Sequence, residues 1–278
     1  MYYVERLRNG RSFCSRRVTA IQKGSAIFAM MANFMTQEPG LEHQDPMPNV
    51  PPPEAVKSLK DQYRDILKDP SLPPGIRKGI EQSLSLPFPV DLRRVTPATL
   101  GERLSPQPAT HRAWMRVQGR LSDSLIIAQC ALAYMSDWSL LETSLLPHGL
   151  HQRISKSGNS VSMASIDHTI HFHHPFRADE WLLYDMDSPS ASGGRGFTRG
   201  RFFTRDGKLI VSTSQEGLIR VVKGPLPPLR PVGTREKDKK EIKASGETNS
   251  TAGPSSTSIK PTDPSFTEAI KGQIKSNL

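Results

Sequence analysis

The 278-residue chain is 36% hydrophobic, enough for a real core in one or two domains, and its 24 prolines indicate additional irregular chain. Its net charge of +10 suits a ligand that carries phosphates. The sequence lacks the arginine runs and the aromatic–basic alternation typical of RNA-binding proteins, so we expect no nucleic acid partner. Two cysteines, Cys14 and Cys130, lie in core-like surroundings and indicate a reducing compartment. We see no secretory signal and no membrane-spanning run.

The first 110 residues change in character near residue 36. Residues 1–36 predict three strands, with a turn at Lys23-Gly24 between the second and the third. Residues 37–110 are rich in proline and predict one helix at about 53–67, with an apolar side. We interpret this second region as a connector that packs on a surface.

Residues 111–222 predict one complete α+β unit. We expect a strand at 111–120, a helix at 123–142, and strands at 160–176, 180–187, 194–205 and 208–222. The helix is apolar on nearly every side, which predicts that it is buried on every side. The simplest arrangement is an antiparallel sheet wrapped around this central helix. Residues 223–278 are too polar to form a core, and we expect them to be disordered.

A weak internal repeat relates the two halves of the chain. The segment that begins at Gly10 aligns with the segment that begins at Gly194, and the hairpin glycine Gly24 aligns with Gly207. Two hairpins with the same turn chemistry would give the same pattern. If the repeat is real, the second copy has its helix well before Gly194, whereas only nine residues precede Gly10. The first copy would then lack its helix.

Asp137 is the most informative residue of the predicted helix, because an unpaired carboxylate in a buried apolar helix is costly. One reading places Asp137 in a functional pocket, where removal from water makes a carboxylate a stronger base. The other reading places it at a frayed, solvated helix end. The residues alone leave both readings open.

Two later stretches carry polar residues in otherwise apolar strands. Gln215 interrupts the strand at 208–222, either as an exposed bulge or as an amide that holds a water or a substrate carbonyl. In residues 163–176, alternation places His171 and His173 on one face with Asp167 beyond them, which raises the question of a metal site. No further cysteine or glutamate ligand follows at a fixed spacing, so we predict no metal.

A Ser/Gly-rich loop at 188–194 leads into a basic strand. Arg195, Arg199 and Arg201 are candidates to meet phosphate groups, with help from the amides of the loop. The segment lacks the spacing of any phosphate-loop motif. It also lacks a G-x-S-x-G elbow, so an α/β-hydrolase is not supported.

Three stretches are typical of one family: AYMSDWSLL, SMASIDHTIHFHHPFRADEWLLYDMDSPSASGGRGFTRGRFFTRDGKLIVSTSQEGLIR, and VERLRNGRSFCSRRVTAIQKGSAIF. Through them the chain resembles the type II acyl-CoA thioesterases, the bacterial enzyme and its peroxisomal relatives, over residues 2–222. The resemblance implies a double hot-dog fold and the hydrolysis of fatty acyl-CoA to free acid and CoA, with no cofactor. It also implies that Asp137 is a general base to a water that Ser165 and Gln215 orient.

The resemblance implies supporting roles for other residues. Asp167 and His168 belong to the family pattern, and we interpret them as structural supports. The three arginines at 195, 199 and 201 become candidates for binding CoA.

The resemblance and the repeat together predict an incomplete first hot-dog at 1–36, a connector at 37–110, a complete second hot-dog at 111–222 and a tail at 223–278. The alternative to an active thioesterase is a truncated, non-catalytic hot-dog protein that binds acyl-CoA or a partner subunit. A third hypothesis is a basic nucleic-acid-binding protein, which steep salt dependence of oligonucleotide binding would support. The sequence leaves a homo-oligomer open.

The last three residues, Ser276-Asn277-Leu278, are close to the Ser-Lys-Leu signal that directs proteins to peroxisomes. Asn277 departs from the usual basic residue. We therefore expect a weak peroxisomal signal, and otherwise a cytoplasmic location.

Overall fold

A computed structural model describes residues 1–85, 88–95, 105–150 and 160–224, so the predicted tail lies almost wholly outside the described residues. The chain divides into two compact units, Met1–Gln44 and Asp45–Leu278. None of the helices in the described ranges is both long enough and apolar enough to cross a membrane.

The first unit is a three-stranded antiparallel sheet in the order β1 (Tyr2–Asn9), β2 (Phe13–Gln22), β3 (Ser25–Met35). The predicted three strands are therefore confirmed. Lys23 and Gly24 form the turn between β2 and β3, with φ angles of 50° and 79°, as a two-residue hairpin turn requires. Residues 1–44 are all described and include no helix.

The second unit is built on a seven-stranded sheet in which every pair of neighbouring strands is antiparallel. The strand order is β4 (Val90–Arg94), β5 (Thr110–Val117), β8 (Leu182–Ser192), β9 (Arg195–Thr204), β10 (Leu209–Val222), β6 (Ser160–Ser165), while β7 (Thr169–Phe172) also pairs with β10. The predicted strand at 160–176 is thus two strands. The break occurs where the amides of Ile166 and Asp167 both donate to the Glu216 carbonyl oxygen.

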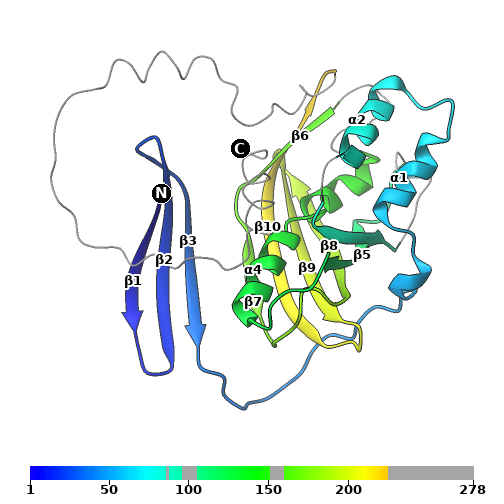
Figure 1. Ribbon diagram of the computed structural model, residues 1–278. Helices are drawn as coiled ribbons and strands as arrows, with labels where there is room; N and C mark the ends of the chain where they lie inside the picture. The colour runs from blue at the N-terminus through cyan, green and yellow to red at the C-terminus, as the bar shows by residue number, and fades with distance from the viewer. Residues whose placement is uncertain (86–87, 96–104, 151–159, 225–278) are drawn as a thin grey trace. The chain divides into compact units, whose positions relative to one another are not determined.

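The sheet curls around helix α4 (Leu125–Met135), as Figure 1 shows, which confirms the predicted arrangement. Leu132 and Met135 on α4 are fully buried against the inner face of the sheet. The prediction that α4 is buried on every side is wrong, because Ile126 is 71% exposed and Cys130 is exposed too. Among the described residues the sheet covers one side of the helix only.

After α4 the chain continues into a 3-10 helix, η2 (Leu141–His148), which packs against two glycines, one in β9 and one in β10. A Cβ atom added to Gly217 would collide with the Leu141 side chain, and one added to Gly196 would collide with Ser144. Glycine at these two positions lets η2 lie against the sheet. The segment that carries Asp137 is held between α4 and η2.

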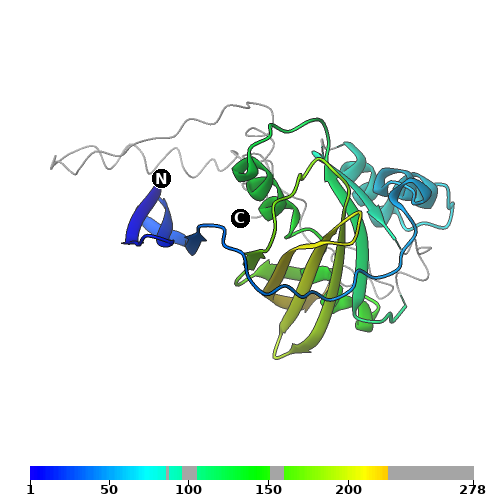
Figure 2. The same ribbon diagram turned by 90° about the horizontal axis from the view of Figure 1, so that it is seen from below.

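The outer face of the sheet has its own apolar cluster, centred on Trp114, Leu183 and Phe203. The irregular segment after Asp45 runs across this face in Figure 2. Its Met47 and Val50 pack on the cluster, and the Trp114 indole nitrogen donates to the Pro51 carbonyl oxygen at 2.8 Å. This part of the proline-rich region is therefore packed on a surface.

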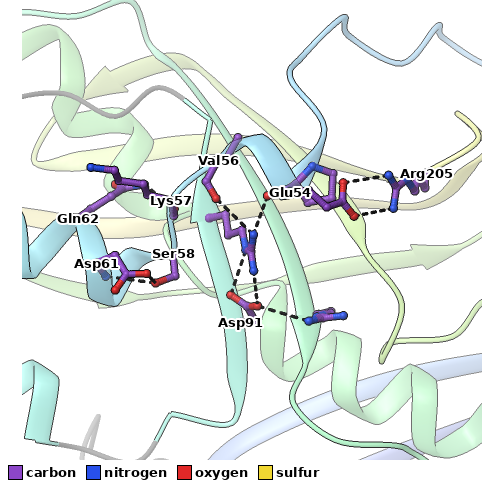
Figure 3. A network of polar contacts seen from close by, with 11 residues as sticks. Glu54, Val56, Lys57, Ser58, Asp61, Gln62, Asp91 and Arg205 are labelled. Atoms are coloured by element: carbon purple, nitrogen blue, oxygen red, sulfur yellow. Dashed lines mark hydrogen bonds and ion pairs between the residues drawn. The ribbon is translucent and has the colours of Figure 1, made fainter.

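A short 3-10 helix, η1 (Pro53–Ala55), and helices α1 (Leu59–Leu67) and α2 (Pro74–Ser85) follow. The predicted helix at 53–67 starts later because Ser58 caps α1 by accepting the Asp61 amide. Figure 3 shows how polar contacts fasten this segment, with Glu54 forming a two-point ion pair with Arg205. Arg93 donates to the carbonyl oxygens of Pro53 and Val56.

Candidate functional site

Asp137 lies immediately after the end of α4, where Ser136 is the C-terminal cap. The predicted helix at 123–142 would include Asp137, but α4 ends before it and its side chain is exposed, so its position fits the reading of a solvated helix end. The chain leaves the helix at this point because Trp138 and Ser139 begin a turn, in which Ser139 has a φ of 63°. The carboxylate is therefore at the rim of the core and within reach of a bound molecule.

Gln215 points from β10 toward this carboxylate and is fully buried. Its Nε2 atom lies 2.7 Å from Asp137 Oδ1 and 2.9 Å from Ser165 Oγ. Because a carboxylate only accepts hydrogen bonds, the amide nitrogen must face Asp137. One Nε2 hydrogen goes to each partner, so Gln215 joins the two side chains that the sequence predicted beside it.

Ser165 reaches the site through the pairing of β6 with β10. It is the last residue of β6 and lies opposite Gly217, so its side chain is on the same face as that of Gln215. The Ser165 hydroxyl accepts the Gln215 hydrogen bond, which leaves its own hydrogen free to donate to a substrate or a water. Asp137 after the end of α4, Ser165 on β6 and Gln215 on β10 thus meet at one place.

Asp167 and His168 each contact a residue that is adjacent in sequence to one of the central residues. Asp167 Oδ1 accepts the Glu216 amide at 3.0 Å, next to Gln215. His168 Nε2 lies 2.8 Å from Ser136 Oγ, next to Asp137. Burial lowers the pKa of His168, while the charges of Asp137 and Asp167 act in the opposite direction. A supporting role for these two residues stays a prediction.

Arg195, Arg199 and Arg201 do not join this cluster. They lie on the face of β9 that points away from Gln215, because Thr198 and Gly200 take the inner positions. Each arginine is already paired with a carboxylate. Arg195 pairs with Glu216, Arg199 pairs with Asp187, and Arg201 pairs with both Asp185 and Asp45. A role for these arginines in binding CoA stays a prediction.

The sequence reading missed the groups beneath the site. Ser136 is fully buried and hydrogen-bonded, and Tyr184 and Thr213 lie under it. The sequence did contain a signal for them, because Tyr184 stands in an apolar strand and a buried tyrosine hydroxyl usually has a hydrogen-bond partner. Which partner it has depends on the curl of the sheet.

Comparison with known proteins gives a consistent result. Residues 83–218 match a family model described as acyl-CoA thioesterase. Acyl-coenzyme A thioesterase 8 of Mus musculus is 41% identical over 226 residues, which cover 80% of this chain and 68% of the mouse protein. The peroxisomal acyl-coenzyme A thioester hydrolase 1 of Saccharomyces cerevisiae is 26% identical over 264 residues, covering 78% of this chain and 73% of the yeast protein.

Solved structures agree with the fold. The acyl-CoA thioesterase II of Mycobacterium marinum has a TM-score of 0.60 and 37% identity, covering 80% of this chain and 73% of that chain. A hot-dog protein of Alicyclobacillus acidocaldarius has a TM-score of 0.58 at 19% identity, covering 79% of this chain and 72% of its own, which bears on the fold alone. The sheet around α4 is therefore a hot-dog.

Proposed function

Because the chain belongs to the acyl-CoA thioesterase family and is a hydrolase of that family, we propose that it cleaves fatty acyl-CoA with a water activated by Asp137. The observation that carries this proposal is the Gln215 amide, which holds Asp137 and Ser165 at 2.7 and 2.9 Å. A base and a hydroxyl donor held by one buried amide suit the orientation of one small molecule.

In the proposed reaction the Asp137 carboxylate accepts a proton from the water as the water oxygen attacks the thioester carbonyl carbon. The Ser165 hydroxyl donates to the water and so directs its free lone pair to that carbon. Gln215 keeps both groups in place. Collapse of the tetrahedral intermediate breaks the carbon–sulfur bond, and the CoA sulfur takes the proton, which gives free acid and CoA.

Turnover of long-chain acyl-CoA by the purified full chain and its variants tests this proposal. Asp137→Asn should lower kcat by roughly 10²–10⁴-fold, the usual contribution of a positioned base, because asparagine accepts the Gln215 hydrogen bond without taking a proton. Gln215→Ala and Ser165→Ala should each lose less, and the combined losses should be well below multiplicative, since all three serve one water.

Asp187→Asn is a matched control, because that aspartate lies on the other face of the sheet, paired with Arg199. It should leave kcat unchanged. Near-normal turnover of a folded Asp137→Asn variant would place the base elsewhere, and Asp167 would be the next candidate.

For location we propose the peroxisome. The yeast relative is named a peroxisomal enzyme, which supports this, as does the predicted signal at Ser276-Asn277-Leu278, which lies outside the described residues. A fluorescent protein that carries residues 260–278 should show partial peroxisomal import. A wholly cytosolic signal would contradict the targeting role of the tripeptide.

A further inference from the structure

A buried chain of hydrogen bonds lies directly beneath the residue before Asp137. Tyr184 on β8 is fully buried, and its hydroxyl donates to the Ser136 carbonyl oxygen at 2.7 Å. The Oγ1 atom of Thr213 on β10 lies 3.1 Å from the same hydroxyl. The single hydroxyl hydrogen of Tyr184 goes to Ser136, so Thr213 is the donor in the second bond. The chain of bonds runs from Thr213 through Tyr184 to Ser136.

Ser136 is held through every polar group that it has. Its amide donates to the Leu132 carbonyl oxygen at 2.8 Å, and its hydroxyl donates to the Ala133 carbonyl oxygen at 2.9 Å. The same hydroxyl is in contact with His168. The remaining group is the carbonyl that Tyr184 binds, and this carbonyl belongs to the planar peptide group that includes the Asp137 nitrogen and Cα atoms. Its direction therefore sets the direction in which Asp137 leaves α4.

The chain of bonds also connects the two elements of the proposed site. Thr213 stands two residues before Gln215 on β10, so the two side chains share the inner face of the sheet. Ser136 precedes Asp137. We propose that Tyr184 is a positioning residue that keeps Asp137 within hydrogen-bond distance of Gln215. This inference rests on the proposed function and adds a residue to it.

The surroundings of Tyr184 fix its ring and keep its hydroxyl a donor. Its ring stacks on Phe202, with centroids 3.8 Å apart and planes 11° apart. A Cβ atom added to Gly200 would collide with the ring and with Thr213, so a glycine here makes the room that the phenol occupies. Burial raises the pKa of Tyr184 well above its ordinary value, so the hydroxyl stays protonated.

The test is steady-state turnover of acyl-CoA by the full chain with Tyr184→Phe, which keeps the ring and removes the hydroxyl. We expect kcat to fall by about tenfold or more, with KM within about twofold of the parent, because the substitution moves the base and not the substrate. Thr213→Val should lose less, and Thr213→Ser, which keeps the hydroxyl, should restore the parent kcat.

Ser144→Ala is the matched control, because it also removes a buried hydroxyl that donates to a backbone carbonyl, at 2.6 Å from the Leu141 oxygen. It should lower the melting temperature by a similar amount without changing kcat. If Tyr184→Phe only lowers the melting temperature, as Ser144→Ala does, its role is structural and the inference fails.

The double variant Asp137→Asn/Tyr184→Phe separates this inference from the proposed function. Tyr184→Phe should cost little in the Asp137→Asn background, since it acts through Asp137. An equal loss in both backgrounds would overturn the positioning role. A fully active Asp137→Asn variant would instead overturn the proposed function.

A readout without turnover is the exchange of the Gln215 carboxamide hydrogens with water, followed by NMR. Both hydrogens are bonded in the parent, to Asp137 and Ser165. Exchange should be at least about tenfold faster in folded Tyr184→Phe, because the bond to Asp137 is loosened. Unchanged exchange would show that Asp137 stays in place without the Tyr184 hydroxyl, and the inference would be wrong.

Discussion

His168 has one ring nitrogen bonded to Ser136 and a second, Nδ1, that is buried without a hydrogen-bond partner among the described residues. The Ser136 hydroxyl hydrogen already goes to the Ala133 carbonyl oxygen, so Nε2 must be the donor to Ser136. The neutral ring then leaves Nδ1 as an acceptor. A second proton would place a buried, unpaired N–H there, which agrees with the lowered pKa of His168.

This lowered pKa predicts how stability depends on pH. The unfolded chain binds a proton at the ordinary histidine pKa of about 6.5, before the folded chain does. The contribution of His168 is therefore complete above about pH 6.5 and is lost as the pH falls toward the lower folded value. The melting temperature of the parent should fall between about pH 7 and pH 5.

The fall should be smaller in His168→Gln but should not vanish, because burial also lowers the pKa of His173, and that histidine contributes in the same direction. Carboxylates with lowered pKa, such as Asp65 at about 2, change the stability only at more acidic pH, so they do not affect this comparison of melting temperatures. Equal pH dependence in parent and His168→Gln would rule out this histidine as the source.

At the residue scale the sequence could identify the central side chains but not their surroundings. Asp137 and Gln215 stood out because each departs from the apolar pattern around it, whereas Ser165 came only from the family resemblance. Their meeting depends on the register that places Ser165 opposite Gly217, and a pattern of residue types does not contain that register. The exposed position of Asp137 likewise depends on where α4 ends.

β10 is the element that assembles the site, since it pairs with β9 on one side and with β6 and β7 on the other. It also provides Gln215, Thr213 and Gly217, one of the two glycines on which η2 packs. The sequence predicted its bounds almost correctly, because a long apolar run with β-branched residues is a strong strand signal. It missed β4, which is short, and α2, whose two glycines hide its helical pattern.

The contact between η2 and β10 gives a prediction for Gly217→Ala. The new methyl group would collide with Leu141 and should cost about 1–3 kcal/mol of stability, as overpacking in a core does. Adding Leu141→Ala removes the collision. The double variant should therefore be less destabilised than the sum of the two single variants, measured by urea unfolding. Strict additivity would mean that the cost of Gly217→Ala does not come from the collision with Leu141.

The two units of the molecule differ in what they bury. In Met1–Gln44 only Ala20 is buried, and large apolar side chains such as Tyr2 and Met31 are 69% and 66% exposed. The second unit has a core on each face of its sheet, one around α4 and one around Trp114. The sequence predicted strands in both units equally well, because alternation reports local pairing. It does not report what lies over the face of a sheet.

This difference predicts the behaviour of the separate units. A peptide of residues 1–44 should show no cooperative thermal transition as a monomer, because one small sheet without a core does not outweigh the entropy of ordering the chain. Residues 45–224 should melt cooperatively, since both cores and the contacts of Asp137, Ser165 and Gln215 lie within them. Circular dichroism on heating, with sedimentation to establish the monomer, measures both. A cooperative transition in monomeric 1–44, or none in 45–224, would mean that apolar burial within a unit does not decide whether it folds.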